Sequence, residues 1–128
     1  MKIVEAMTPF PHTIGAEQSV ARAEEMMNEY GVRHLPVLNG GKLQGIITSR
    51  DILLMKSFPD VDINKTKILE SSTMDPYQVS PSADIAEVCS EMSENKYSCA
   101  IVTESDKVVG IFSWVDALKV LADKARSG

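Results

Sequence analysis

The sequence predicts an α/β (α+β) fold in which two β-α-β-β-α repeats pack together with pseudo-twofold symmetry. Two observations predict it. The chain of 128 residues is similar to itself at an offset of 65 residues, and each copy carries the same order of helical and strand patterns. A unit of about sixty residues buries little apolar surface by itself, so we expect the two copies to form one core.

The repeat is supported by identities along most of the chain. An offset of 65 aligns residues 14–53 with 79–118, and nine of these forty positions are identical, where ordinary amino-acid usage gives roughly two or three. Near the start of each copy, Met7-Thr8-Pro9 matches Met74-Asp75-Pro76 two residues out of register. We therefore expect a two-residue loop exchange around a shared Met-x-Pro turn. The domain organisation is then a first repeat over 1–57, a linker over 58–66 and a second repeat over 67–128.

The first helix of each repeat has one apolar stripe at helical spacing. Ser19 and Asp84 occupy equivalent N-cap positions, and Asp84 with Glu87 resembles a capping box. The stripe consists of Val20, Ala23, Met27 and Tyr30 in the first repeat and of Ile85, Val88, Cys89 and Met92 in the second.

Two β-rich runs around a turn follow each of these helices and predict a hairpin. A short strand is expected before the helix, and a second helix after the hairpin. The expected strands lie at 13–14, 34–38 and 43–48 and at 78–79, 99–103 and 108–113. The expected second helices lie at 49–55 and 114–124, and residues 124–128 are expected as a frayed end.

Composition and charge disfavour several classes of function. Lys and Arg number 13 and Asp and Glu 18, so the net charge of −5 disfavours a nucleic-acid partner. No apolar run approaches the ~18–20 residues needed to cross a bilayer, and the N-terminus lacks the apolar segment of a signal peptide, so we expect a cytoplasmic protein without a membrane partner. Cys89 and Cys99 are expected as small buried hydrophobes, and no metal site is expected.

The most informative residues occur at the start of each second helix. The segments 45–51 and 110–116 share a glycine, a hydroxyl and, three residues later, a carboxylate: Thr48 with Asp51, and Ser113 with Asp116. One interpretation is structural, since a hydroxyl at the N-cap and a carboxylate at N3 form a helix cap. The other is functional. A helix N-terminus binds anions through its free amides, and a carboxylate one turn later can accept hydrogen bonds from a ribose.

These residues resemble a tandem pair of cystathionine-β-synthase (CBS) domains, also called a Bateman module. The features that carry the resemblance are the Met-x-Pro starts, the segment Arg33-His34-Leu35-Pro36-Val37 and both Gly-h-h-[Thr/Ser]-x-x-Asp segments, where h is hydrophobic. The resemblance covers about residues 2 to 124 and leaves no catalytic domain. It implies a stand-alone regulatory module that binds an adenosine-containing ligand (AMP, ADP, ATP or S-adenosylmethionine), requires no cofactor and has no catalytic residues.

The resemblance also implies two ligand clefts, each built from both repeats. The first would be lined by Thr13, Ile14, Arg33, His34, Pro36, Ile111, Phe112, Ser113 and Asp116. The second would be lined by Ile46, Ile47, Thr48, Arg50, Asp51, Gln78, Val79, Ser98 and Cys99.

The two clefts differ in their capacity to bind phosphate. The first contains Arg33, a permanent cation that can bind phosphate in bidentate fashion, with His34 beside it. The second has Ser98 and Cys99 at the equivalent positions, and Arg50 is its alternative cation. We therefore expect the first cleft to bind a nucleotide more tightly.

Three classes of function remain. The first is a sensor of adenine nucleotides that signals to an effector protein, and the second is a ligand-free dimerisation or protein-interaction module. The third, an enzyme, is disfavoured because the sequence has no motif-placed nucleophile set and no phosphate-binding Gly-x-x-x-x-Gly-Lys loop. Pairs of this family associate as homodimers through helices, so we expect a homodimer. The apolar stripe Ala117, Leu118, Val120 and Leu121 fits either that interface or internal packing.

Overall fold

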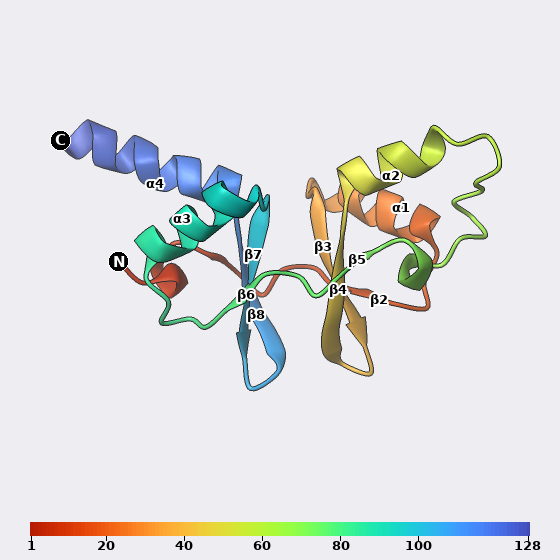
Figure 1. Ribbon diagram of the computed structural model, residues 1–128, viewed down its shortest axis with the longest axis horizontal. Helices are drawn as coiled ribbons and strands as arrows, with labels where there is room; N and C mark the ends of the chain where they lie inside the picture. The colour runs from red at the N-terminus through yellow and green to blue at the C-terminus, as the bar shows by residue number, and fades with distance from the viewer. The chain divides into compact units, whose positions relative to one another are not determined.

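The chain folds into two compact units. The computed structural model describes the backbone of residues 1–128 and all side chains except those of Thr73 and Met74. We call residues His12–Pro76 the α1–α2 unit, and residues Met1–Pro11 with Tyr77–Gly128 the α3–α4 unit (Figure 1). Each unit consists of a small mixed sheet and two α-helices, so the predicted fold class is confirmed.

In the α1–α2 unit, four strands form a sheet in the order β2-β3-β4-β5. Strand β2 is parallel to β3, whereas β3, β4 and β5 are antiparallel to their neighbours. Both helices pack on one face of this sheet (Figure 1). The elements are β2 (Ile14–Gly15), α1 (Val20–Tyr30), β3 (His34–Asn39), β4 (Lys42–Thr48), α2 (Ser49–Lys56), the 3-10 helix η2 (Ile68–Glu70) and β5 (Thr73–Met74).

The α3–α4 unit repeats this arrangement with the order β6-β7-β8-β1. Strand β6 is parallel to β7, and the other pairs are antiparallel. The elements are the 3-10 helix η1 (Ile3–Glu5), β1 (Thr8–Pro9), β6 (Gln78–Val79), α3 (Ile85–Asn95), β7 (Cys99–Glu104), β8 (Lys107–Ser113) and α4 (Trp114–Ser127).

Each unit is completed by a segment from the other sequence repeat. The N-terminal segment carrying η1 and β1 belongs to the α3–α4 unit, where the Ile3 amide donates to the Ala83 carbonyl at 2.8 Å. The segment carrying η2 and β5 belongs to the α1–α2 unit, where the Ile68 amide donates to the Gln18 carbonyl at 2.9 Å. Sequence periodicity does not predict this exchange, because it depends on partners far along the chain.

The exchanged segments correct the expected register shift between the repeats. Pro9 of β1 pairs with Gly110, and Met74 of β5 pairs with Gly45, so both pairs keep the offset of 65. Phe10 and Asp75 both have positive φ, 44° and 53°, at the same offset. The alignment of Met7-Thr8-Pro9 with Met74-Asp75-Pro76 is therefore wrong, and the repeats align without a gap here.

Buried residues form two clusters, not the single core that the sequence predicts. The cluster of the α1–α2 unit includes Val20, Leu35 and Ile68, and the cluster of the α3–α4 unit includes Ile3 and Phe112. The exchanged isoleucines explain the difference. Ile3 comes from the first repeat and is fully buried in the α3–α4 unit, and Ile68 comes from the second repeat and is fully buried in the α1–α2 unit.

Two predictions at helix ends are wrong. Asp84 makes no side-chain cap bond; instead the first amide of α3, that of Ile85, donates to the carbonyl of Met1 at 3.0 Å. The exchanged N-terminus thus replaces the capping box. The expected frayed end is helical, because α4 continues to Ser127. Lys124 and Arg126 lie in its last turn, where positive charge is favourable to the helix dipole.

We predict that Ile3→Ala lowers the free energy of unfolding by about 2 to 5 kcal/mol, since it removes a fully buried side chain and leaves a cavity. Val4→Ala is the control, because Val4 is 46% exposed and its truncation should change stability by less than ~0.5 kcal/mol. Urea denaturation measures both. Equal effects of the two substitutions would contradict the role of Ile3 in the core.

Candidate ligand-binding site

In each sheet, one face packs against the helices and the other carries predicted ligand residues. Leu35 and Val37 of β3 belong to the core cluster, so strand alternation turns His34 and Pro36 to the opposite face. His34 pairs with Thr48, and Pro36 with Ile46. This opposite face, here called the helix-free face, therefore brings together residues from both predicted clefts.

The helix-free face of the α3–α4 unit has the equivalent arrangement. Cys99 pairs with Ser113, Ile101 with Ile111, and Gln78 of β6 with Ile101. Ile111 and Cys99 are both 8% exposed. The residues that this face brings together again come from the two predicted clefts.

Four predicted residues have side chains on the core side. Ile14 and Ile47 belong to one core cluster, Phe112 to the other, and Val79 packs against the latter. Their side chains are occupied by core packing, so only their main-chain groups can contact a ligand. The sequence did not distinguish the two faces for these positions, since both sides of the strands are apolar.

The two helix N-termini are both capped, although they differ in detail. In α2, the Asp51 amide donates to Thr48 Oγ1 at 3.1 Å and the Thr48 amide donates to Asp51 Oδ2 at 3.0 Å. In α4, the amide and hydroxyl of Ser113 both donate to Asp116 Oδ2, at 2.8 and 3.2 Å. The structural interpretation of these motifs is therefore confirmed, and it leaves room for a ligand. A carboxylate has about four acceptor positions.

Thr8 is a site residue that sequence reasoning missed. Its hydroxyl donates to Asp116 Oδ1 at 3.2 Å, and Asp116 is only 8% exposed. Thr8 and Asp116 are 108 residues apart, so no local pattern connects them. The exchanged N-terminal segment thus contributes to the surroundings of the carboxylate, and a ribose at Oδ1 would compete with Thr8.

The loops before β3 and β7 approach the same helix N-termini. The Ser49 amide donates to the Arg33 carbonyl at 2.9 Å, and the Trp114 amide donates to the Ser98 carbonyl at 3.2 Å. Arg33 is exposed, so its guanidinium is accessible to an anion. Arg50 is also exposed and contributes to a cavity of about 380 Å³ between α1 and α2.

The described residues supply neither a metal site nor a membrane span. No group of three or more His, Cys, Asp or Glu side chains among them is arranged to hold a metal ion. None of the helices in the described part of the chain has the length and apolar character that a bilayer crossing requires.

Two segments of the chain match the model of a known domain family. The model of the CBS domain matches residues 3–56 and 68–123. The chain belongs to the CBS domain family. The two matched segments are the two sequence repeats, so the tandem CBS pair inferred from the motifs is confirmed over nearly the whole chain.

Relatives of this CBS pair include both short proteins and parts of enzymes. Hypoxic response protein 1 of Mycobacterium tuberculosis is 26% identical over 113 residues, which are 88% of this chain and 79% of that protein. Inosine-5'-monophosphate dehydrogenase of Korarchaeum cryptofilum is 30% identical over 105 residues, which are 81% of this chain and only 21% of the dehydrogenase.

Solved structures of CBS pairs are also similar. The CBS pair of protein MJ0100, solved in complex with 5'-methylthioadenosine and S-adenosyl-L-methionine, has a TM-score of 0.88 at 26% identity, covering 97% of this chain and 98% of that one. The acetoin utilization protein AcuB from Vibrio cholerae has a TM-score of 0.86 at 27% identity, covering 98% and 93%.

Cys99 of the second predicted CBS cleft has a chemically inert thiol. Burial raises its pKa to about 12, whereas burial raises the pKa of the half-buried Cys89 thiol to a smaller extent. A thiol reacts as the thiolate, so Cys99 remains unreactive at neutral pH. It can therefore contribute to a ligand site by packing and weak hydrogen bonding, not as a nucleophile.

We predict that Ellman's reagent at pH 8 modifies Cys89 slowly in the folded protein and leaves Cys99 intact, while both react in denaturant. The unfolded thiol has an ordinary pKa near ~8.5. The free energy of unfolding therefore falls as pH rises above about 9, because only the unfolded state releases the Cys99 proton. Cys89→Ser is the control that isolates Cys99. Rapid labelling of that folded variant would contradict the burial of Cys99.

Proposed function

We propose that this chain is a regulatory CBS module that binds an adenosine-containing ligand and passes the binding signal to an effector protein. The observation that carries the proposal is the repeated arrangement of a hydroxyl and a carboxylate at a helix N-terminus, next to a helix-free sheet face. The similarity to the CBS pair of MJ0100, whose structure holds two adenosine-containing ligands, supports the same ligand class.

The chemistry of the capped helices fits a ribose. Thr48 Oγ1 accepts one hydrogen bond from the Asp51 amide, so its own proton remains available for donation. Asp51 and Asp116 each retain acceptor capacity beyond their cap bonds, and ribose hydroxyls are donors. Together these groups recognise a nucleoside without any catalytic step.

We also propose that the site containing Arg33 binds phosphorylated ligands more tightly than the other. Arg33 offers a permanent, exposed cation, and its equivalent is the neutral Ser98. This proposal assigns Arg33 to the first predicted cleft, together with Ser113 and Asp116, as the family resemblance implies. In inosine-5'-monophosphate dehydrogenase of Korarchaeum cryptofilum, the matching segment makes up only 21% of the enzyme.

Isothermal titration with AMP and with 5'-methylthioadenosine tests the proposed role of Arg33. Arg33→Ala should weaken AMP binding roughly 10- to 100-fold, as expected for a charge-assisted hydrogen bond. The same variant should bind 5'-methylthioadenosine within about twofold of wild type, because that ligand has no phosphate. A parallel loss of both ligands would contradict a phosphate contact.

The carboxylates provide the matched control for this titration. Asp116→Asn should abolish the tighter AMP site, whereas Asp51→Asn should leave it in place. If Asp51→Asn alone removed the tighter site, the assignment of the two sites would be reversed. If the wild-type protein bound neither AMP, ATP nor S-adenosylmethionine at millimolar concentration, the sensor proposal would fail.

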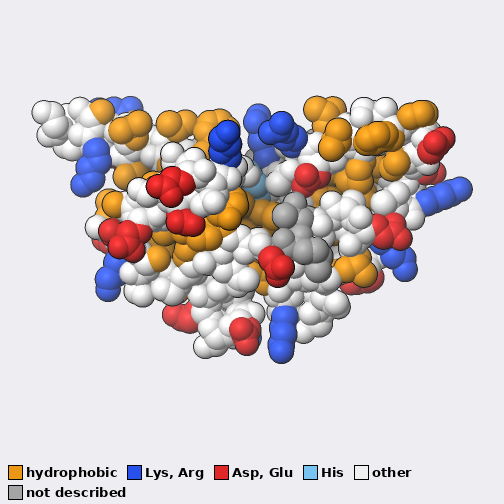
Figure 2. Space-filling model, in the orientation of Figure 1, with side chains coloured by type: hydrophobic (Ala, Val, Ile, Leu, Met, Phe, Trp, Pro, Cys, Tyr) orange, Lys and Arg blue, Asp and Glu red, His pale blue; other side chains and the backbone are white. Residues whose placement is uncertain are grey.

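A second candidate function, protein association, is favoured by exposed apolar side chains on α2 and α4. Leu53 and Leu54 of α2 are 71% and 61% exposed, and Leu118 and Leu121 of α4 are 51% and 63% exposed. Figure 2 shows hydrophobic side chains gathered over these two helices. Such exposure is costly in water, so we propose that both helices bind a second copy of the chain.

Sedimentation velocity tests this association. We expect the wild-type protein to sediment as a dimer and the double variant Leu53→Glu/Leu121→Glu to sediment as a monomer, because buried charge opposes the interface. Leu69→Glu is the control, since Leu69 is 49% exposed and lies outside α2 and α4. A monomeric wild type, or equal dissociation by Leu69→Glu, would rule the interface out.

A further inference from the structure

The chain passes between its two units at residues 10–12 and 75–77, and these crossovers are built alike. Each has a residue with positive φ, then a proline, then a ring: Phe10-Pro11-His12 and Asp75-Pro76-Tyr77. The boundaries of the units fall directly before the two rings, His12 and Tyr77. The first residue of each unit after a crossover is therefore aromatic.

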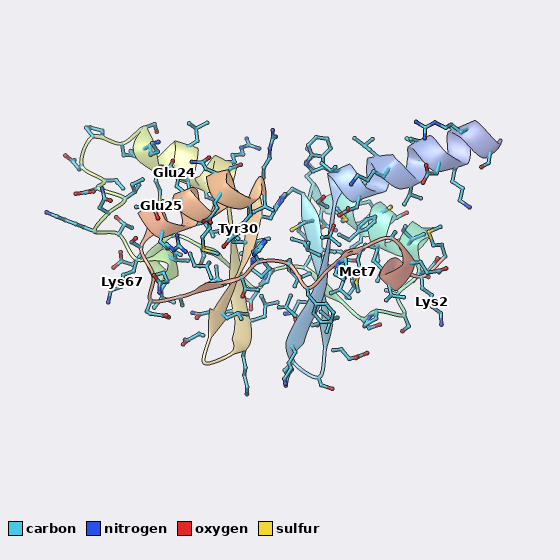
Figure 3. All side chains as sticks on the ribbon, turned by 180° about the vertical axis from the view of Figure 1, so that it is seen from behind. Lys2, Met7, Glu24, Glu25, Tyr30 and Lys67 are labelled. Atoms are coloured by element: carbon cyan, nitrogen blue, oxygen red, sulfur yellow. The ribbon has the colours of Figure 1, made fainter. Side chains whose placement is uncertain are left out.

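Both rings stack on another ring near the C-terminal end of the next helix. His12 stacks on Tyr30, the last residue of α1, with centroids 3.7 Å apart and planes 10° apart. Tyr77 stacks on Tyr97, which follows the C-cap of α3, with centroids 5.2 Å apart and planes 30° apart. Figure 3 shows Tyr30 at the end of α1.

The partner rings are not equivalent in the sequence repeat. An offset of 65 carries Tyr30 to Asn95 and carries Tyr97 back to Val32. The same contact is thus made in the two units with rings from different positions, so it is not inherited from one repeated residue. The two stacks therefore have similar places in the fold although their partner rings come from different positions of the repeat.

The anchored residues lie next to predicted ligand residues. Thr13 directly follows His12, and Arg33 lies three residues after Tyr30 in the loop before β3. The His12–Tyr30 stack therefore joins the two loops that carry Thr13 and Arg33. All of these residues belong to the α1–α2 unit.

The two crossovers differ in the backbone support next to the stack. In the α3–α4 unit, the Ile101 amide donates to the Tyr77 carbonyl at 2.8 Å. Its equivalent in the α1–α2 unit is Pro36, which has no amide proton to donate to His12. The strands that follow the two crossovers, β2 and β6, both have two residues, so the difference lies in this hydrogen bond. Tyr77 is therefore held by both a stack and a backbone hydrogen bond, whereas His12 depends more on its stack.

We propose that His12 and Tyr30 are positioning residues that hold Thr13 and the Arg33 loop in the geometry that binds the ligand. The proposal rests on the proposed function, because it concerns the same ligand site. It adds two residues that lie outside the repeated sequence motif and that act through their stacked rings. Tyr77 and Tyr97 form the equivalent, better supported anchor in the other unit.

Titration with AMP at 25 °C tests this role. Tyr30→Leu removes the stacking ring and keeps apolar bulk, and it should weaken the tighter AMP site roughly three- to tenfold, the range expected for loss of an aromatic pair. Tyr30→Phe keeps the ring and should restore wild-type affinity within about twofold. The matched control Tyr97→Leu removes the other stack and should leave the tighter site unchanged.

Hydrogen exchange of the Ala16 amide gives a readout without ligand. This amide donates to the Leu38 carbonyl next to β2, so it reports on the anchoring of that strand. Exchange should be faster in Tyr30→Leu than in wild type or Tyr97→Leu. Unchanged exchange, or unchanged AMP affinity in Tyr30→Leu, overturns the proposal. If wild-type protein binds no adenosine ligand, the proposed function fails; faster exchange then still supports the anchor, and unchanged exchange overturns it.

Discussion

The structure depends on the exchange of two short segments, one from each repeat. Each repeat alone is too small to bury a secure core, and each unit receives a fully buried isoleucine from the other repeat. Ile3 and Ile68 enter through 3-10 helices whose amides bond to loop carbonyls before α3 and α1. Core packing in both units and the hydrogen bond at the start of α3 follow from this exchange.

The exchange also shapes the candidate site. Strand β1 lies beside β8, and this places the Thr8 hydroxyl on the Asp116 carboxylate. Figure 3 shows Met7 of the same segment beside these strands, and its thioether occupies the space that a side chain at Gly110 would need. Packing against Met7 thus explains the glycine at position 110 of the repeated Gly-h-h-[Thr/Ser]-x-x-Asp segment. The Asp116 carboxylate has a neighbour, Thr8, that is 108 residues away in the sequence.

Local patterns predicted most of the fold, because helix stripes, hairpin turns and caps are determined by nearby residues. The Ser19 cap, the turn at Gly40-Gly41 and the Thr48–Asp51 box are all present as expected. The elements that local patterns do not predict are η1, β1, η2 and β5. They are two or three residues long and depend on distant partners, as β1 does where Thr8 pairs with Ile111. The site was harder to predict. Residues alternate between the two faces of β3 and β7, but the sequence does not show which face packs against the helices, because both are apolar.

The different make-up of the two units has a consequence for synthesis of the chain. The α1–α2 unit is one continuous stretch, His12–Pro76, so it has all its residues once Pro76 has left the ribosome. The α3–α4 unit joins Met1–Pro11 to Tyr77–Gly128, so its N-terminal segment is synthesised well before the rest of the unit. Ile3 stays without its final packing partners until Phe112 of the same cluster has been synthesised. The connectivity therefore allows the α1–α2 unit to be complete while residues 1–11, which precede it in the sequence, still lack their packing partners.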